Sequence, residues 1–211
     1  QLSKYFNLVV WDMRGHGQTD YPEDQNLYSE EETIEDIYGI LNDLGVKKAN
    51  IGGMSLGGYM SLAFYYKYPD MVDSLIIIDT GPGFKNADAR GKWNNYALSQ
   101  AKKFEEIGLE CLKGKSKEMD PDNHKNASGL VRAARGMLTQ KDDRIINGLT
   151  DISVPCLIVV GENDKPFLAS TDYMAKKIEN SKKVIIPDAG HAVNIDQPNI
   201  FNNEIINFYL K

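Results

Sequence analysis

The sequence has too few cysteines for a disulfide-rich extracellular domain. Only Cys111 and Cys156 occur among 211 residues, and together they allow one disulfide. Cys156 lies inside an apolar run that is typical of a buried strand, whereas Cys111 has a different context. Two incidental or buried thiols fit a reducing cytoplasm better than an oxidising compartment. We therefore expect two free thiols and a cytoplasmic location.

The sequence also lacks a long apolar run and an excess of basic residues. A helix that crosses a bilayer needs about 20 consecutive apolar residues, and no stretch approaches that length. The chain has 24 Lys and Arg against 30 Asp and Glu, a formal net charge of -6, and its lysines are scattered. Binding of nucleic acid requires a basic face. We therefore expect neither a membrane nor a nucleic acid as a partner.

What the sequence does contain is the composition of a globular domain with β-strand patterns. Hydrophobic residues make up 42% of the chain and charged residues 26%, which is ordinary for one domain with a substantial core. Apolar runs rich in β-forming residues predict strands covered on both faces, as in a parallel sheet. The predicted strands are about 5–11, 48–52, 74–79, 155–161 and 183–187.

Helical patterns alternate with these strands. Ser29, with Glu32 three residues later, resembles a capping box, and Gly45 is suited to end the helix that follows. Further helices are predicted over about 56–67 and 198–210. Alternation of strands and helices is typical of a mostly parallel α/β sheet.

One long segment interrupts this alternation. Residues from about 82 to 150 are polar and helix-prone, with little β-strand signal. We therefore expect a single α/β domain over 1–211, with its core formed by 1–81 and 151–211. The segment 82–150 is then a helical cap or lid inserted into that core.

Small residues flank one serine in the stretch 51–58. Gly53 and Gly57 stand two residues on either side of Ser55, which is the spacing of a G-x-S-x-G nucleophile elbow. A sharp strand-to-helix turn lifts the serine hydroxyl toward a base, and such a turn requires neighbours without bulky side chains. The pattern alone is weak, because glycine and serine are common in loops. The rest of the chain decides whether Ser55 is a nucleophile or a turn residue.

A base for Ser55 can be chosen by elimination among three histidines. Catalytic groups of open parallel sheets gather at the carboxyl ends of the strands, and His191 follows the last predicted strand on a short loop. His16 lies between two glycines and is predicted to be a turn residue, while His124 is predicted to be a solvated loop residue. We therefore expect His191 to remove the Ser55 proton and to return it to the leaving group.

Two carboxylates compete for the role of the acid that orients His191. Asp164 follows the predicted strand 155–161, and Asp79 ends the predicted strand 74–79. Either can reach a histidine from its strand end, so spacing does not choose between them. We prefer Asp164 and keep Asp79 as the alternative acid, whose other interpretation is a cap or turn residue. Glu162 is a weaker third candidate.

Three motifs follow one another in chain order. They are Asp-Met-Arg-Gly-His-Gly at 12–17, Gly-Met-Ser-Leu-Gly-Gly at 53–58, and Gly-Glu-Asn-Asp at 161–164 with Gly-His at 190–191. With these motifs in order, nearly the whole chain resembles the α/β-hydrolase fold superfamily. The serine in the elbow is similar to the serine esterase and lactonase branch, and it argues against the branches with an aspartate nucleophile.

This resemblance implies a function. A serine hydrolase of this branch cleaves a small carboxylic ester or lactone through an acyl-enzyme, without a metal or an organic cofactor. By resemblance, Asp12 and Arg14 brace their loop rather than react. The rivals are a carbon–carbon bond hydrolase with the same triad and a ligand-binding or regulatory relative with little turnover. A homo-oligomer is compatible with the sequence, which does not decide the oligomeric state.

The chain departs from the family pattern at its start. Family members have additional strands before the one predicted here, and a loop after one of them supplies one of two backbone donors of the oxyanion hole. The Leu56 N–H, which follows the nucleophile, supplies the other donor. We therefore expect an α/β-hydrolase sheet that lacks its first strands, as part of a longer protein.

Overall fold

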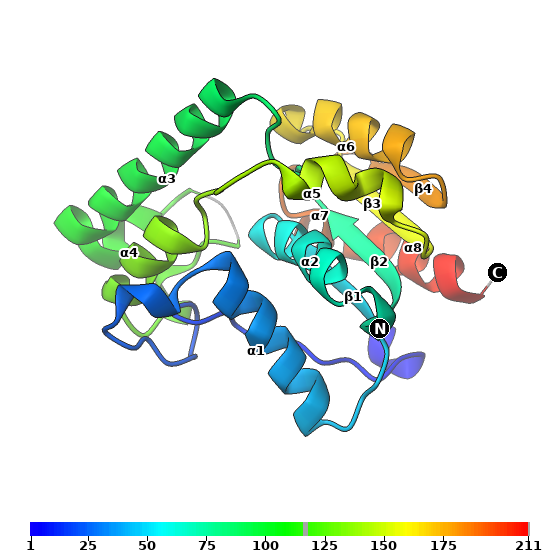
Figure 1. The fold of residues 1–211 in the computed structure, drawn as a ribbon, viewed down its shortest axis with the longest axis horizontal. Helices are drawn as coiled ribbons and strands as arrows, with labels where there is room; N and C mark the ends of the chain where they lie inside the picture. Colours follow the sequence, from blue (N-terminus) through cyan, green and yellow to red (C-terminus); the bar gives the residue numbers. More distant parts are fainter. Residues whose placement is uncertain (116–117, 211) are drawn as a thin grey trace. The chain divides into compact units, whose positions relative to one another are not determined.

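The computed structural model describes residues 1–115 and 118–210 and contains a four-stranded parallel sheet (Figure 1). The strands lie in chain order, and Ile77 of the second strand pairs with Gly53 on one side and Ile158 on the other. The prediction of a parallel α/β sheet is confirmed. The strands are β1 (Ala49–Met54), β2 (Val72–Ile78), β3 (Cys156–Gly161) and β4 (Ser181–Ile186).

Helices precede, connect and follow the strands. The helix before β1 begins as predicted at a capping serine, since the Glu32 N–H donates to Ser29 Oγ at 3.1 Å. The crossover helix between β3 and β4 is an element that the sequence prediction leaves out. The helices are α1 (Glu30–Asp43), α2 (Leu56–Lys67), α6 (Lys165–Lys177), α7 (Val193–Asp196) and α8 (Pro198–Leu210).

The core forms on both faces of the sheet because side chains alternate along each strand. Ile78 of β2 packs in one buried cluster with Phe201 and Ile205 of α8. Leu75 and Ile77, on the opposite face of β2, have no exposed surface, and α2 packs on β1 and β2. The central strands β2 and β3 are therefore largely buried, and the loops at the carboxyl ends of the strands offer positions for polar side chains.

The segment between β2 and β3 is helical. Its main helices are α3 (Ala87–Ile107) and α4 (Ala127–Gly136), which pack on each other, followed by the short α5 (Arg144–Asn147). The described residues of 82–150 form no strand, in agreement with the predicted helical character. Short 3-10 helices complete the chain: η1 (Leu2–Lys4), η2 (Gln25–Leu27), η3 (Pro69–Met71), η4 (Gly108–Leu112), η5 (Pro121–Asn123) and η6 (Gly148–Asp151).

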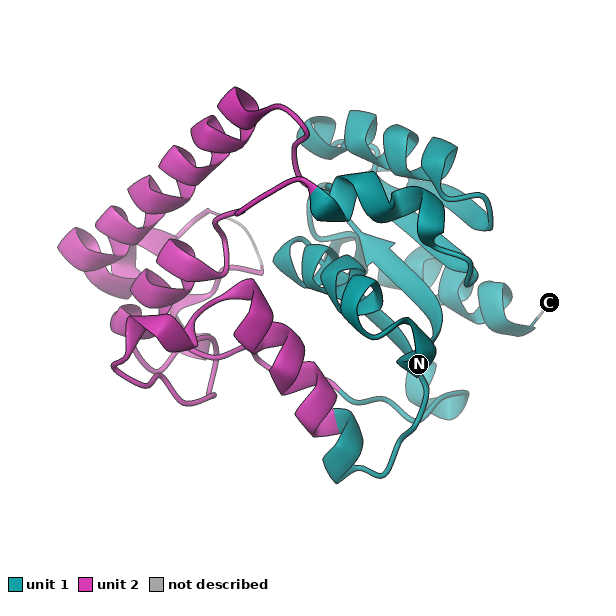
Figure 2. Cartoon of the chain, viewed as in Figure 1, with its two compact units in different colours: residues 1–9, 41–82, 144–211 teal, residues 10–40, 83–143 magenta. Residues whose placement is uncertain are grey.

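The chain divides into two compact units (Figure 2). The first unit contains the whole sheet and consists of Gln1–Val9, Leu41–Pro82 and Arg144–Lys211. The second unit consists of Val10–Ile40 and Gly83–Asp143. The second unit thus includes most of the predicted insertion together with an earlier part of the chain.

The strand predicted over 5–11 does not form, and that prediction is wrong. These residues pair with no strand of the described chain. Apolar side chains favour a strand only where a neighbouring strand supplies hydrogen-bond partners and a second layer covers them. Here Val10 is 89% exposed and Val9 is 56% exposed, so neither condition holds.

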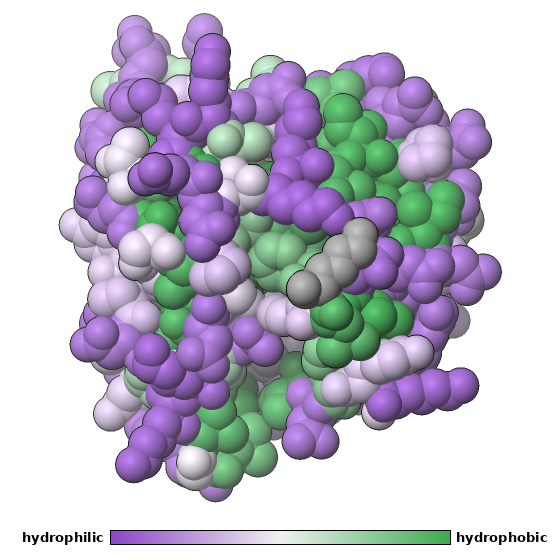
Figure 3. Space-filling view, turned by 90° about the vertical axis from the view of Figure 1, so that its right-hand side faces the viewer, coloured by the Kyte–Doolittle hydropathy of each residue, from purple (hydrophilic) through white to green (hydrophobic). Residues whose placement is uncertain are grey.

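Hydrophilic residues cover most of the surface seen in Figure 3, and hydrophobic residues show there as separate patches. Among the helices of the described residues, none combines the length and the apolar character that a membrane span needs.

Candidate active site

Ser55 occupies a strained turn between β1 and α2. Its backbone φ is 54°, a conformation that residues other than glycine adopt at a cost of about 1–3 kcal/mol. The Ser55 N–H donates to the Ile78 carbonyl at 2.9 Å, which ties the turn to the end of the neighbouring strand. A sharp strand-to-helix turn of this kind is what the elbow motif predicts.

Close backbone contacts explain the glycines around the serine. A Cβ on Gly53 would overlap the backbone of Gly57, and a Cβ on Gly58 would lie 2.6 Å from Thr80 Cγ2 and 2.9 Å from the Gly53 carbonyl oxygen. A Cβ on Gly57 would meet nothing within 4 Å. The steric demand therefore falls on Gly53 and Gly58, whereas the motif position Gly57 supplies only its backbone.

A histidine–carboxylate pair follows the last two strands of the sheet, with Asp164 after β3 and His191 after β4. His191 Nδ1 lies 2.8 Å from Asp164 Oδ2, and Asp164 is 5% exposed. The Asp164 N–H donates to the Gly161 carbonyl at 3.0 Å, which fixes the carboxylate beside the end of β3. A carboxylate in this position holds one tautomer of the imidazole and leaves Nε2 to accept a proton.

The loop that carries His191 is held by two contacts. The Gly190 N–H donates to Asp196 Oδ2 at 2.9 Å, within a tight turn that ends in α7. A Cβ on Gly161 would overlap the Gly190 carbonyl oxygen, so the loops after β3 and β4 approach each other closely. Glycine at position 161 therefore permits the approach of Asp164 to His191.

Two contributors to this site are absent from the sequence prediction. The Phe167 ring stacks on the His191 ring, with centroids 5.1 Å apart and planes inclined by 28°. Phe167 follows Asp164 by three residues, and helical spacing places such a pair on one face, so this signal was present in the sequence. No pattern pointed to Asp196, because its role depends on the closure of the 190–196 turn.

Asp79, the alternative acid, makes different contacts. It has no exposed surface, and its φ of 45° turns the chain sharply at the end of β2. Its carboxylate accepts the Gly161 N–H at 2.8 Å and the Val193 N–H at 3.4 Å. Burial raises the pKa of Asp79 to about 7, with Asp164 adding to the rise, while these two N–H groups oppose it. The structure thus places Asp164 against His191 and Asp79 between the backbones of two loops.

A free backbone donor follows Ser55. The Leu56 N–H is at the first position of α2, and no described residue accepts a hydrogen bond from it. The first N–H groups of a helix have no partner inside the helix and carry partial positive charge. This donor is suited to an oxyanion formed by attack of Ser55.

The other two histidines lie together in the second unit. The Gly17 N–H donates to His124 Nδ1 at 3.0 Å, and the His16 and His124 rings are 6.3 Å apart. His124 is therefore half-buried and bonded, so its prediction as a solvated loop residue is wrong. Burial is the main cause that lowers the pKa of both histidines, although Asp12 acts in the opposite direction. His16 lies in a turn, as predicted.

Arg14 braces its loop, as the family resemblance implied. Its guanidinium group donates two hydrogen bonds to the Asp36 carboxylate, at 2.6 and 3.1 Å, and one to the Leu27 carbonyl at 2.8 Å. It also lies 3.3 Å from Glu32, and these acidic partners raise the pKa of Arg14. The Asp12 carbonyl accepts the Thr19 hydroxyl at 2.7 Å. Both residues therefore connect elements of the second unit.

The residues described by the structure contain no group of three or more His, Cys, Asp or Glu side chains arranged to hold a metal ion. Cys111 and Cys156 are both free thiols, as predicted. Burial raises the pKa of the Cys156 thiol to about 12, so this side chain behaves as a small apolar residue.

Comparison with known proteins decides the family. The sequence pattern described as the alpha/beta hydrolase fold matches residues 1–106, half of the chain. The chain belongs to the alpha/beta hydrolase fold family. This confirms the family resemblance of the three motifs and agrees with the parallel sheet. Relatives in the family include proteins named as hydrolases, lactonases and esterases, which supports a hydrolase.

Three relatives illustrate the likeness. A Bacillus subtilis (strain 168) protein, provisionally named 2-succinyl-6-hydroxy-2,4-cyclohexadiene-1-carboxylate synthase, is 28% identical over 95% of this chain and 80% of its own. The 3-oxoadipate enol-lactonase 1 of Acinetobacter baylyi (strain ATCC 33305 / BD413 / ADP1) is 29% identical over 95% of this chain and 77% of its own. A thermophilic esterase from Thermogutta terrifontis, solved with malate bound, has a TM-score of 0.83 at 27% identity, over 99% of this chain and 81% of its own.

Proposed function

We propose that this alpha/beta hydrolase cleaves a small carboxylic ester or lactone through an acyl-enzyme on Ser55. The observation that carries the proposal is the 2.8 Å contact between His191 Nδ1 and Asp164 Oδ2, at the same sheet edge as the strained Ser55 turn. A serine, a histidine and a buried carboxylate at the carboxyl ends of parallel strands form the constellation used for acyl transfer.

Each residue has a defined part in the proposed reaction. Ser55 Oγ attacks the carbonyl carbon while His191 Nε2 takes the hydroxyl proton, and Asp164 stabilises the imidazolium that forms. The Leu56 N–H donates to the oxyanion of the tetrahedral intermediate. His191 then gives the proton to the leaving alcohol oxygen, and a water molecule releases the acid from Ser55 by the reverse sequence.

The matched relatives support the ester and lactone class. One is named 3-oxoadipate enol-lactonase 1 and another pimeloyl-[acyl-carrier protein] methyl ester esterase, and both align with at least 95% of this chain. Both names describe cleavage of a bond between an acyl carbon and oxygen. The substrate that we propose is therefore of small-molecule size and contains such a bond.

Turnover of a p-nitrophenyl ester by two matched variants tests the roles of the carboxylates. Asp164→Asn removes the negative charge beside His191 but keeps the shape of the side chain at position 164. We expect kcat to fall on the order of 10³–10⁴-fold. Asp79→Asn changes a carboxyl that bonds to backbone N–H groups, and we expect a much smaller loss. Collapse of turnover in Asp79→Asn with activity retained in Asp164→Asn would assign the acid to Asp79 instead.

Carbon–carbon bond cleavage or formation is a second candidate. The Bacillus subtilis relative is provisionally named as a synthase of a cyclohexadiene carboxylate. The names of the relatives are therefore not all names of ester or lactone hydrolases. In such chemistry the same histidine moves protons on a carbon framework, and ester turnover is slow. If the unmodified protein, with His191 and Asp164 in place, had negligible activity on every ester and lactone tried, that result would favour this candidate.

We also propose that the segment of about 82–150 acts as a cap that selects the substrate. An aromatic row supports this, since the Trp93 ring lies 6.0 Å from the Phe84 ring and 5.5 Å from the Tyr96 ring. Tyr96 is 51% exposed and therefore accessible to a ligand. Exchange of Tyr96 for Ala is expected to change KM more than kcat, while a structural residue would change the stability instead.

A further inference from the structure

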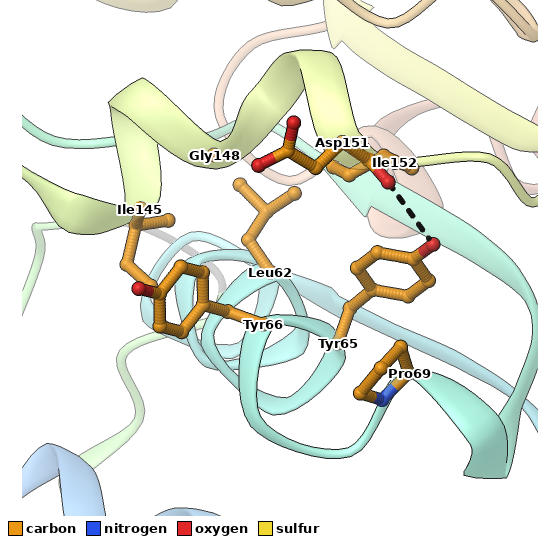
Figure 4. A pocket seen from close by; sticks show the side chains of 8 residues that line it. All are labelled: Leu62, Tyr65, Tyr66, Pro69, Ile145, Gly148, Asp151 and Ile152. Atoms are coloured by element: carbon orange, nitrogen blue, oxygen red, sulfur yellow. Dashed lines mark hydrogen bonds between the residues drawn. The ribbon is translucent and has the colours of Figure 1, made fainter.

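A pocket of about 160 Å³ lies in the first unit and shares no residue with the proposed catalytic site (Figure 4). It opens between the carboxyl-terminal half of α2 and the α5–η6 segment, with η3 at one side. Its first α2 residue, Leu62, follows Ser55 by seven residues, or about 10 Å along a helix. The eight residues that line it are Leu62, Tyr65, Tyr66, Pro69, Ile145, Gly148, Asp151 and Ile152.

The inner wall of the pocket is apolar. Leu62, Ile145 and Ile152 are all buried, at 2%, 4% and 5% exposure. An enclosed cavity of about 150 Å³ lined by Leu, Ile and Phe binds one benzene molecule. The pocket therefore has room for a single ring or a branched alkyl group of similar size.

Two tyrosines add aromatic surface. Tyr65 is buried and its hydroxyl is occupied, because it contacts the Ser153 hydroxyl at 3.2 Å and the Asp151 carbonyl at 3.4 Å. Tyr66 is 52% exposed, and its ring forms part of the outer wall (Figure 4). The faces of such rings attract cations.

The charge of the lining has one sign. Figure 4 shows the Asp151 carboxylate extending over Leu62, and among the described residues no side chain donates a hydrogen bond or an ion pair to it. None of the eight lining residues is a lysine, an arginine or a histidine. An anionic ligand would meet this carboxylate without a compensating cation, whereas an ammonium group would be attracted to it.

We propose that this pocket binds a small organic cation, namely a primary ammonium group on an apolar body about the size of a benzene ring. The body fills the space against Leu62, Ile145 and Ile152. The ammonium group lies at the mouth, where the Asp151 carboxylate and the Tyr66 ring face it. The site is independent of ester cleavage, because the catalytic serine, histidine and aspartate take no part in it.

Amide chemical shifts measured during a titration with benzylammonium at neutral pH and constant ionic strength test the proposal. We expect saturable shifts at residues of α2, α5 and η6, with a dissociation constant on the order of 1 mM for so small a ligand. Benzyl alcohol, which has the same ring and no charge, is expected to bind about tenfold more weakly. Benzoate is expected to cause no saturable shift at these amides.

Two variants and a control assign the contacts. Asp151→Asn is expected to remove the preference for benzylammonium over benzyl alcohol, and Tyr66→Ala to weaken both. Asp70→Asn, in η3 beside the pocket but outside its lining, is the matched control and is expected to bind like the unmodified protein. Equal binding of amine and alcohol by the unmodified protein, absence of shifts at these amides, or equal effects of Asp151→Asn and Asp70→Asn would overturn the proposal.

Discussion

Asp79 is a buried carboxyl group that directly follows β2. Its folded pKa of about 7 lies above the ordinary value of 3.8, because burial disfavours the charged form. An acid whose pKa is raised on folding stabilises the folded state fully below its unfolded pKa. That contribution is lost as the pH rises from 3.8 toward the folded value of about 7.

The Asp79→Asn variant tests this dependence of stability on pH. The unfolding free energy of the unmodified protein is expected to fall as the pH rises across this window. Asp79→Asn removes the titrating group, so we expect the fall in the variant to be smaller by about 1.4 kcal/mol per pH unit. The amide keeps one acceptor for the Gly161 N–H but presents a donor toward Val193, so a pH-independent loss is also expected. Urea unfolding at several pH values measures both. Parallel pH profiles for the two proteins would contradict the raised pKa.

At the scale of elements, the approach of α2 to β1 depends on one of two adjacent glycines. A Cβ at position 58 would meet Thr80 Cγ2 at 2.6 Å and the Gly53 carbonyl oxygen at 2.9 Å, while one at position 57 would meet nothing within 4 Å. We therefore expect Gly58→Ala to destabilise the fold by about 1–3 kcal/mol, as overpacking of a core does.

Gly57→Ala is the matched control. Alanine favours a helix over glycine by roughly 1 kcal/mol, so this substitution is expected to be neutral or stabilising. Thermal unfolding of the two variants side by side measures the difference. If Gly57→Ala were the more damaging of the pair, the helix–strand packing described for the elbow would be wrong.

The loop at 12–17 is joined to His124 by a hydrogen bond. His124 Nδ1 accepts the Gly17 N–H, and protonation would turn this acceptor into a donor. Burial lowers the folded pKa of His124 below 6.5, while Asp12 and Asp120 partly offset the shift. A base whose pKa falls on folding stabilises the folded state above the unfolded pKa and loses that contribution as the pH falls below it.

Hydrogen exchange of the Gly17 amide reports this contact directly. We expect its protection to fall as the pH drops below 6.5, where His124 gains a proton. His124→Asn offers a carbonyl acceptor without a titration, and is expected to flatten that pH dependence. Protection that does not change with pH in the unmodified protein would show that His124 does not control the loop.

At the scale of the whole molecule, the sequence predicts the four strands that pair in the sheet. It also predicts a strand over 5–11, where no neighbouring strand is present among the described residues. Residues 5–11 have the apolar character of a buried strand, but side-chain character does not reveal whether another strand pairs with them. Asp164 and Asp79 were equivalent in spacing. Their separation depends on backbone turns, since the Asp79 φ of 45° directs its carboxylate to the backbones of two loops.

In the candidate site, too, local patterns predict some residues, and other contacts depend on the fold. His191 could be selected from three histidines by its place after a strand, because parallel strands end at one edge of the sheet. The contact of Asp196 with the Gly190 N–H required the fold, since it forms only where the 190–196 turn closes. The pairing of Gly17 with His124 joins residues more than a hundred positions apart, and no local pattern indicates it.

The central claim is that Ser55 is a nucleophile activated by His191. Treatment with a fluorophosphonate probe, followed by peptide mass spectrometry, measures this directly in the unmodified protein and in the Ser55→Ala and His191→Ala variants. We predict one adduct, on the peptide and side chain of Ser55, with its rate strongly reduced in His191→Ala and no adduct in Ser55→Ala. An unmodified protein without an adduct at Ser55, or equal labelling of Ser55 in His191→Ala, would contradict the account.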